Sequence, residues 1–254
     1  MLIRFNTRHI CHTKKNRQSG QAALEFAIVF LLFAALITGL FEMTRVFRTK
    51  HTLNAATFMA ARTGIVNNAL AQPMNSELEN GMIELFIRGG RSLEELGEAT
   101  VRARAFGVQL GQLGGGVEII NPTREMHRQL HINQRVLRAD EEDYDVHSVI
   151  PNDNLRWRPR VVARSDEGET NLQDANLLKI RSLWCHRLVV PLLDRIIYET
   201  INTAIFFNAA QGTCTALSES SRNGNNTIDT GFYIAIAADA TLRMQSPVVA
   251  DNLP

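Results

Sequence analysis

The chain has 254 residues, of which 45% are hydrophobic, and a formal net charge of +1 at pH 7. With 16 Gly and 7 Pro, this composition is ordinary for a globular domain with room for a substantial core. The part after the leader has no strongly basic stretch of the kind that marks a nucleic-acid-binding surface, so we expect no nucleic acid partner.

The first twenty residues form a basic leader without Asp or Glu. An excess of Lys and Arg beside a membrane segment marks its cytoplasmic side. The amino end is therefore predicted to stay in the cytoplasm and the remainder to be exported. Without the leader the chain would have 22 basic and 26 acidic residues, a net charge of −4. The leader charges are Arg4, Arg8, Lys14, Lys15 and Arg17.

The segment 22–41 is almost entirely apolar. At about 1.5 Å per residue, twenty helical residues span about 30 Å, the thickness of the hydrocarbon layer of a membrane. A secretory signal peptide has a shorter apolar core, of roughly 7 to 15 residues, followed by a small-residue cleavage site. The longer run therefore predicts a membrane helix over 21–41, which a simple uncleaved anchor would explain as well as any other single-pass design.

Glu25 is a lone carboxylate inside this apolar run. A charge at depth in a membrane costs several kcal/mol, so its presence near the helix start suggests a function. In a bundle of parallel helices, Glu25 of one subunit could meet the free α-amine of a neighbour. Breaking such a buried pair costs about 3 to 5 kcal/mol. The alternative is that Glu25 lies close enough to the headgroups to reach water.

Gly20, followed by Glu25 at the fifth place after it, resembles the processing site of type IV prepilins. The stretches Gly20–Ala27 and Phe41–Arg45 resemble the TadE-like pseudopilins of tight-adherence (Flp) pilus systems. The resemblance implies cleavage after Gly20 by a prepilin peptidase, leaving Gln21 as the new amino terminus. Gln21 departs from the small or apolar residues usual there, and a terminal Gln can cyclise and lose its amine charge. Further similar stretches are Asn121–Thr123, Ile150–Asp153, Asp174–Lys179, Val190–Leu192 and Met244–Pro247.

This resemblance implies a minor pilin or pseudopilin that takes part in assembling a Flp/Tad type IV pilus. The implied partners are a prepilin peptidase, a major Flp-type pilin, a companion minor pilin and an inner-membrane assembly platform, besides membrane lipid. The chain would cross the bacterial inner membrane once, with its carboxyl-terminal domain in the periplasm. The alternative is an uncleaved, membrane-anchored periplasmic binding protein.

The expected fold is α+β, with a long membrane-spanning helix followed by a pilin-like domain whose sheet is mainly antiparallel. We divide the chain into a leader 1–20, a membrane helix 21–41, an amphipathic extension 42–66 and a periplasmic domain 67–254. Apolar residues recur every three or four positions as far as Gly64, which predicts one helix of roughly 65 Å with Gly64 near its C-cap. Two helices broken near Thr38 to Thr44 are equally compatible with the sequence.

Two further helices are predicted over 77–88 and 92–106, with Ser92 and Glu95 forming a capping box at the start of the second. The glycines of 107–116 are expected to separate the second helix from the strand that follows. Strands are predicted at 117–121, 177–190 and 232–244, the last from its strict alternation. A helical turn is predicted at 124–130 and a helix from Pro191 to Ile205. Polar loops are predicted at 139–170, apart from 157–164, and at 218–229.

Cys185 and Cys214 both lie in the predicted exported part, where oxidation is permitted, whereas Cys11 lies in the leader. A disulfide between them is predicted, and it would stabilise the fold by about 3 to 4 kcal/mol on the chain-entropy model. Two buried free thiols are the alternative. Neither a CxxC pair nor a well-spaced His accompanies them, so zinc is not expected.

Catalytic motifs are weak throughout. His127 and His131 have the spacing of a metal pair but lack the Glu of a zinc-protease helix between them. The acidic loop 139–145 could bind calcium, yet it lacks the mid-loop glycine and terminal glutamate of an EF-hand. We therefore expect no enzymatic activity, no cofactor and no metal, with surface histidines and a solvated acidic loop instead.

Overall fold

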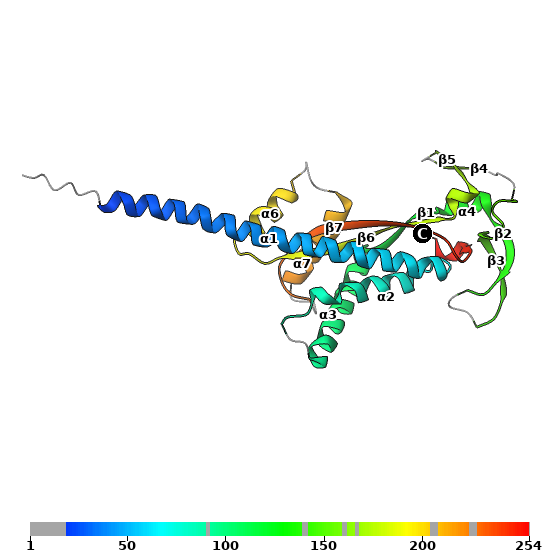
Figure 1. The fold of residues 1–254 in the computed structure, drawn as a ribbon, viewed down its shortest axis with the longest axis horizontal. Helices are drawn as coiled ribbons and strands as arrows, with labels where there is room; N and C mark the ends of the chain where they lie inside the picture. The colour runs from blue at the N-terminus through cyan, green and yellow to red at the C-terminus, as the bar shows by residue number, and fades with distance from the viewer. Residues whose placement is uncertain are drawn as a thin grey trace, which may run out of the picture. The chain divides into compact units, whose positions relative to one another are not determined.

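The computed structural model describes residues 19–89, 92–138, 142–158, 162–165, 168–203, 208–223 and 228–253. The leader before Ser19, with Cys11, lies outside the described residues, as does the first part of the acidic loop. The chain divides into two compact units, Met1–Phe41 and Glu42–Pro254, and helix α1 (Ser19–Val66) contributes to both (Figure 1).

In the first unit, α1 is apolar around its whole circumference. Its most apolar window has a mean hydropathy of 2.5 and none of it is buried, so the helix is long and apolar enough to cross a membrane. The helix is continuous, and the break considered near Thr38 is not found. The Thr38 hydroxyl donates to the backbone oxygens of Ala34 and Ala35 at 2.9 and 3.1 Å, which satisfies it without interrupting the helix.

The second unit is built on an antiparallel sheet of order β1-β6-β7, which confirms the α+β prediction. It contains β1 (Gly116–Asn121), β6 (Leu177–Leu188) and β7 (Phe232–Arg243). Strands β6 and β7 pair along their full length, with Trp184 opposite Ile236. Their alternating apolar residues meet the distal part of α1, which runs beside the sheet and contributes Leu53 to the same core as Leu178 (Figure 1).

Helix α7 (Ala209–Arg222) packs beside β7, and a disulfide between Cys185 and Cys214 joins β6 to α7. The two Cα atoms lie 5.5 Å apart, so the predicted pairing is confirmed. The expected loop from residue 218 was wrong, because α7 continues to Arg222. Ser218 looks like a loop residue, but its buried hydroxyl donates to the backbone oxygen of Cys214 and accepts from the backbone nitrogen of Tyr233.

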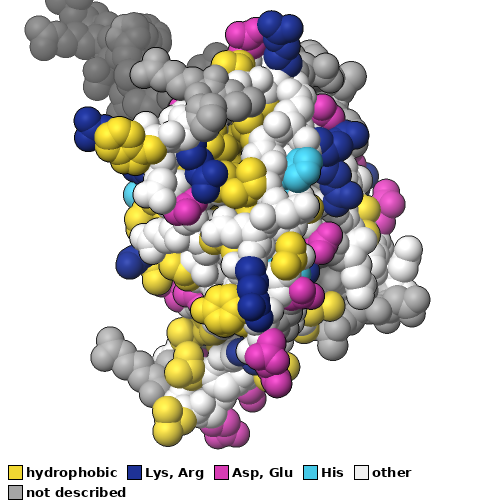
Figure 2. Space-filling view, turned by 90° about the vertical axis from the view of Figure 1, so that its right-hand side faces the viewer, with side chains coloured by type: hydrophobic (Ala, Val, Ile, Leu, Met, Phe, Trp, Pro, Cys, Tyr) yellow, Lys and Arg dark blue, Asp and Glu magenta, His cyan; other side chains and the backbone are white. Residues whose placement is uncertain are grey.

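The segment 139–170, predicted to be irregular apart from 157–164, instead contains strands. β3 (Asp145–Ile150) pairs with β2 (Ile132–Val136) and β8 (Val248–Val249), and β4 (Val162–Ser165) pairs with β5 (Gly168–Asn171). These strands are short and contain many polar residues. A small core of three buried valines supports the sheet formed by β2, β3 and β8. Acidic, basic and hydrophobic side chains are interspersed on this end of the domain (Figure 2).

Two helices follow α1 along the chain: α2 (Ala71–Met82), which leads into the short η1 (Ile83–Leu85), and α3 (Leu93–Gln112). The Ser92 hydroxyl accepts from the Glu95 backbone nitrogen at 3.2 Å, as predicted. The Glu95 carboxylate, however, accepts from the backbone nitrogen of Arg88, so the capping box is only half formed. The remaining helices are α4 (Arg124–Leu130), α5 (Leu172–Ala175), α6 (Leu193–Ile201) and η2 (Ala250–Asn252).

Gly107 and Gly64 both lie inside helices at tightly packed positions, and only the predicted helix end at Gly107 is corrected. Gly107 lies inside α3, where any side chain would meet Glu79 of α2. Gly64 lies inside α1 against the side chains of Met74 and Leu178, and the helix ends beyond it, where Asn68 has a φ of 56°. These glycines allow close approach between elements rather than ending a helix.

Helix α6 begins at Leu193, two residues after the predicted start, because Leu192 has a φ of 73°. Its later part was predicted to continue through Ala204 and Ile205, which lie outside the described residues. The helix ends at Ile201, and Tyr198 packs with Leu188 and Ile234 in a small core.

Candidate functional site

The predicted processing and assembly residues lie in the first two turns of α1. Gly20 and Gln21 have helical backbones, and the side chain of Gln21 lies outside the described residues. Glu25 is exposed and four positions after Gln21, so both are on one face of the helix. Side chains on a helix lean toward its amino end, so the Glu25 carboxylate points toward the turn that begins at Gln21.

A second carboxylate, Glu42, begins the second unit and is buried, with 1% of its surface exposed. It accepts hydrogen bonds from the backbone nitrogens of Val189 and Val190, at 3.3 and 3.2 Å. The Arg45 guanidinium lies 3.7 Å from it on the next turn of α1. A buried carboxylate with these donors fixes the chain after β6 against the helix.

His186 of β6 completes this buried cluster. Its Nδ1 is 2.8 Å from the Thr49 hydroxyl, and its Nε2 is 3.7 Å from a Glu42 oxygen. Burial, with the nearby Arg45 charge, lowers the pKa of His186 to about 4, so the ring is neutral at pH 7. A lone pair facing a carboxylate would be repelled, so we assign the proton to Nε2 and the Thr49 hydroxyl as donor to Nδ1.

Neutral burial of His186 predicts a pH-dependent stability. Its folded pKa of about 4 lies below the ordinary 6.5. Below pH 6.5, His186 binds a proton in the unfolded chain but stays neutral in the folded chain. The unfolding free energy should thus fall by up to about 3 kcal/mol as the pH drops from 6.5 to 4.

The measurement is chemical denaturation of the full chain in neutral detergent at several pH values. His186→Gln should flatten this slope, although the buried His127, whose pKa is also lowered by burial, keeps part of it. His51→Gln, at an exposed histidine of α1, is the matched control and should leave the slope unchanged. Equal slopes in His186→Gln and the unchanged protein would contradict the assignment.

Sequence reasoning missed the buried role of Glu42. The residue was noted only as part of the stretch Phe41–Arg45, and an acid at the end of an apolar run looks like a surface residue. Its partners Val189 and His186 are more than 140 positions away in the chain. The one available signal was an acid and a base three residues apart at the point where the apolar run ends.

His127 and His131 contact each other, and His127 also contacts β3. The rings of His127 and His131 stack with centroids 5.7 Å apart, and Nε2 of His127 is 3.0 Å from the backbone oxygen of Ser148 on β3. His127 is thereby placed to hold α4 against the sheet. Within the described residues, no group of three or more His, Cys, Asp or Glu side chains is placed to hold a metal ion.

The chain thus combines one apolar helix that could serve as a single-pass anchor with an α+β domain built on antiparallel sheets. The model of the TadE-like protein family matches residues 20–62. The match covers Gly20, Glu25 and Glu42, so the resemblance to TadE-like proteins is confirmed and associates the chain with Tad pilus systems. No curated protein and no solved structure matched the chain.

Proposed function

We propose that this protein is a minor pilin or pseudopilin that a prepilin peptidase cleaves after Gly20 and that takes part in assembling a Flp/Tad pilus. The observation that carries the proposal is the TadE-like match, which begins at Gly20 and includes Glu25 at the fifth place after it. The helix α1 supplies the membrane segment, and its distal part is the support on which the domain is built.

The mechanism follows from the cost of charge in lipid. Glu25 in the apolar run is stabilised when a cationic partner compensates its desolvation. Cleavage after Gly20 would create such a cation at Gln21. A subunit that docks with Glu25 beside the α-amine of a neighbouring subunit is then favoured over a misaligned one. This pairing selects the axial position of each helix in the assembly.

The partners that we propose are a prepilin peptidase, a major Flp-type pilin, a companion minor pilin and an inner-membrane assembly platform. The membrane is the bacterial inner membrane, with the domain 42–254 in the periplasm. In this role the protein acts through contacts between subunits, and we assign it no enzymatic activity.

The proposal is tested by blocking the cleavage site. Gly20→Leu should leave the protein in the membrane fraction with its leader attached and absent from sheared pili, because a bulky side chain hinders entry into a peptidase site. Gly39→Leu is the matched control within the same helix, since no atom lies within 4 Å of a Cβ added there. Normal incorporation of the Gly20→Leu protein would contradict processing as a requirement for assembly.

A further inference from the structure

The second unit contains a pocket of about 630 Å³ that the proposed pilus function does not use. This volume lies within the range of small-molecule sites. Segments far apart in the sequence line it, from α1, the end of η1, α3, β6 and β7, so the folded domain brings the site together. Its charged lining consists of one acid, Asp229, and five arginines: Arg45, Arg48, Arg88, Arg102 and Arg187.

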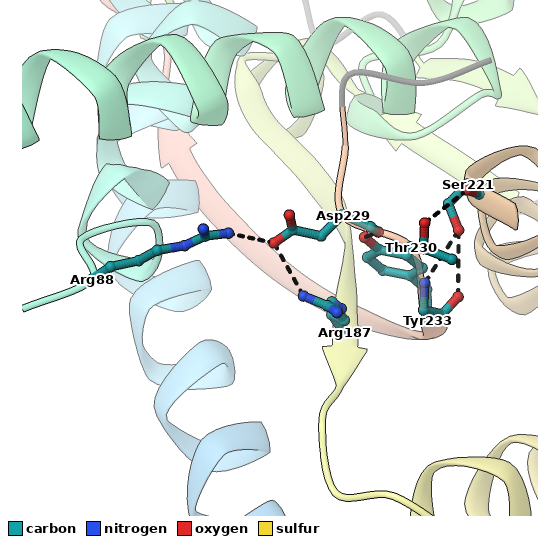
Figure 3. A network of polar contacts seen from close by, with 7 residues as sticks. Arg88, Arg187, Ser221, Asp229, Thr230 and Tyr233 are labelled. Atoms are coloured by element: carbon teal, nitrogen blue, oxygen red, sulfur yellow. Dashed lines mark hydrogen bonds and ion pairs between the residues drawn. The ribbon is translucent and has the colours of Figure 1, made fainter. Parts of the chain in front are cut away.

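One carboxylate forms ion pairs with two of these guanidinium groups. Asp229 pairs with Arg88 at 2.6 Å and with Arg187 at 3.0 Å (Figure 3). Arg102 pairs with Glu98, one turn earlier on α3, at 2.6 Å. Since Glu98 does not line the pocket, the cavity itself faces more guanidinium than carboxylate groups.

The other acids near the pocket are engaged elsewhere. Glu42 is buried behind Arg45 and accepts from backbone nitrogens. The Glu84 carboxylate accepts from the Thr52 hydroxyl, and Arg48 donates to the backbone oxygen of Glu84 at 3.4 Å. These groups reduce the positive charge of the surroundings, but neither Glu42 nor Glu84 lines the pocket.

Arg187 Nε is a buried nitrogen of the lining without a hydrogen-bond partner among the described residues. Two other buried nitrogens of lining residues, Arg45 Nη1 and His186 Nε2, each lie 3.7 Å from a Glu42 oxygen and so face that carboxylate. Buried polar atoms are almost always paired, so Arg187 Nε requires a physical account. Gly231 preserves space beside it, since a Cβ there would lie 2.8 Å from Arg187 Nε.

Aromatic rings form the apolar part of the pocket. Phe106 lies at their centre, with ring centroids 4.9 Å from Trp184 and 5.8 Å from both Phe86 and Tyr233. These rings come from α3, β6, the end of η1 and β7. An apolar surface beside clustered guanidinium groups suits a ligand with an anionic group on an apolar body.

We propose that this pocket binds an organic anion, with carboxylate groups paired to the arginines and an apolar or aromatic body against the rings. Guanidinium groups bind carboxylates through two parallel hydrogen bonds, which gives such a site its specificity. Two sources share this chemistry: a free small carboxylate, and acidic side chains of a partner protein. The inference does not depend on pilus assembly, because the whole pocket lies within 45–233.

Trp184 provides a direct reporter of occupancy, because it lines the pocket and is 3% exposed. The chain has two tryptophans, and the other, Trp157, is 81% exposed. In the full-length protein in neutral detergent, Trp157→Phe leaves Trp184 fluorescence as the signal. The probes are benzene-1,3-dicarboxylate and the peptide acetyl-Asp-Glu-Phe-Asp-amide, each compared with its uncharged carboxamide counterpart.

The variant is Arg102→Gln, because its exposed pair with Glu98 contributes little to stability and the protein should fold. Arg128→Gln, which breaks a similar exposed helical pair with Glu125 outside the pocket, is the matched control. We expect saturable binding of a carboxylate probe, weakened about tenfold or more by Arg102→Gln and unchanged by Arg128→Gln. Weakening by added salt should accompany it.

The two probes distinguish the sources of the anion. Binding of the small dicarboxylate supports a free ligand, and binding of the peptide alone supports an acidic segment of a partner; both outcomes uphold the anion site. The proposal is overturned if neither probe saturates at millimolar concentration, if the carboxamides bind equally well, or if Arg102→Gln and Arg128→Gln behave alike.

Discussion

Replacing Glu25 by Ala is expected to leave the protein in the membrane but to remove it from assembled pili. The substitution strands the α-amine of the neighbouring subunit in an apolar environment. Removing one partner of a buried ion pair costs about 3 to 5 kcal/mol, which corresponds to a loss of incorporation on the order of a hundredfold or more. The measurement is the amount of subunit in the sheared-pilus fraction relative to the membrane fraction.

Two companions make this experiment specific to charge. Glu25→Gln keeps the shape of the side chain and should fail as Glu25→Ala does. Leu24→Ala alters the adjacent exposed position of the same helix turn and should assemble normally. If Glu25→Ala assembled as well as Leu24→Ala, the pairing mechanism would be wrong and Glu25 would be a headgroup-level residue.

Glu42→Gln is expected to destabilise the domain by about 3 kcal/mol. The carboxylate accepts from the backbone nitrogens of Val189 and Val190 and lies beside Arg45, and hydrogen bonds to a charged acceptor contribute about 1.5 to 3 kcal/mol each. The amide keeps the volume but loses the charge opposite Arg45, leaving that guanidinium without its carboxylate. Denaturant unfolding of the full chain in detergent, followed by Trp184 fluorescence, measures the change.

The matched control is Glu98→Gln, which removes a carboxylate from an exposed pair with Arg102 on α3. Exposed pairs of this kind contribute at most about 1 kcal/mol, so the control should stay close to the unchanged protein. Equal effects at Glu42 and Glu98 would show that the buried cluster does not hold the domain on α1.

Long regular elements could be predicted from the sequence because their periodicity is strong. The apolar run followed by a three-and-four repeat predicted α1, and strict alternation predicted β7. The disulfide was predicted from two cysteines in the part of the chain expected to be exported. Short strands such as β2 and β3 were missed because so few positions carry a pattern and tertiary pairing decides their conformation.

Glycine and serine misled the interpretation for a shared reason. Gly107 was taken to end a helix, but it lies inside α3 and makes room for Glu79 of α2. Ser218 was assigned to a loop, although its hydroxyl is satisfied inside α7 by Cys214 and Tyr233. Local propensity cannot reveal a partner that the fold brings from elsewhere in the chain.

The candidate sites also differ in whether the sequence alone could identify them. Glu25 could be singled out because a charge in an apolar run is anomalous within its own segment. Glu42 and the arginine-lined pocket could not. The partners of Glu42 come from β6 and the chain after it, and the five arginines come from four segments: α1, the chain after η1, α3 and β6. Each of these arginines alone has the sequence environment of an ordinary surface residue.

The central claim is tested most directly by the intact mass and the first residue of the protein recovered from membranes of cells with and without an active prepilin peptidase. Our account predicts a chain that starts at Gln21 with its α-amine free when the peptidase is active, and the full leader when it is not. An intact leader in both samples would contradict the account and leave a permanently anchored periplasmic protein.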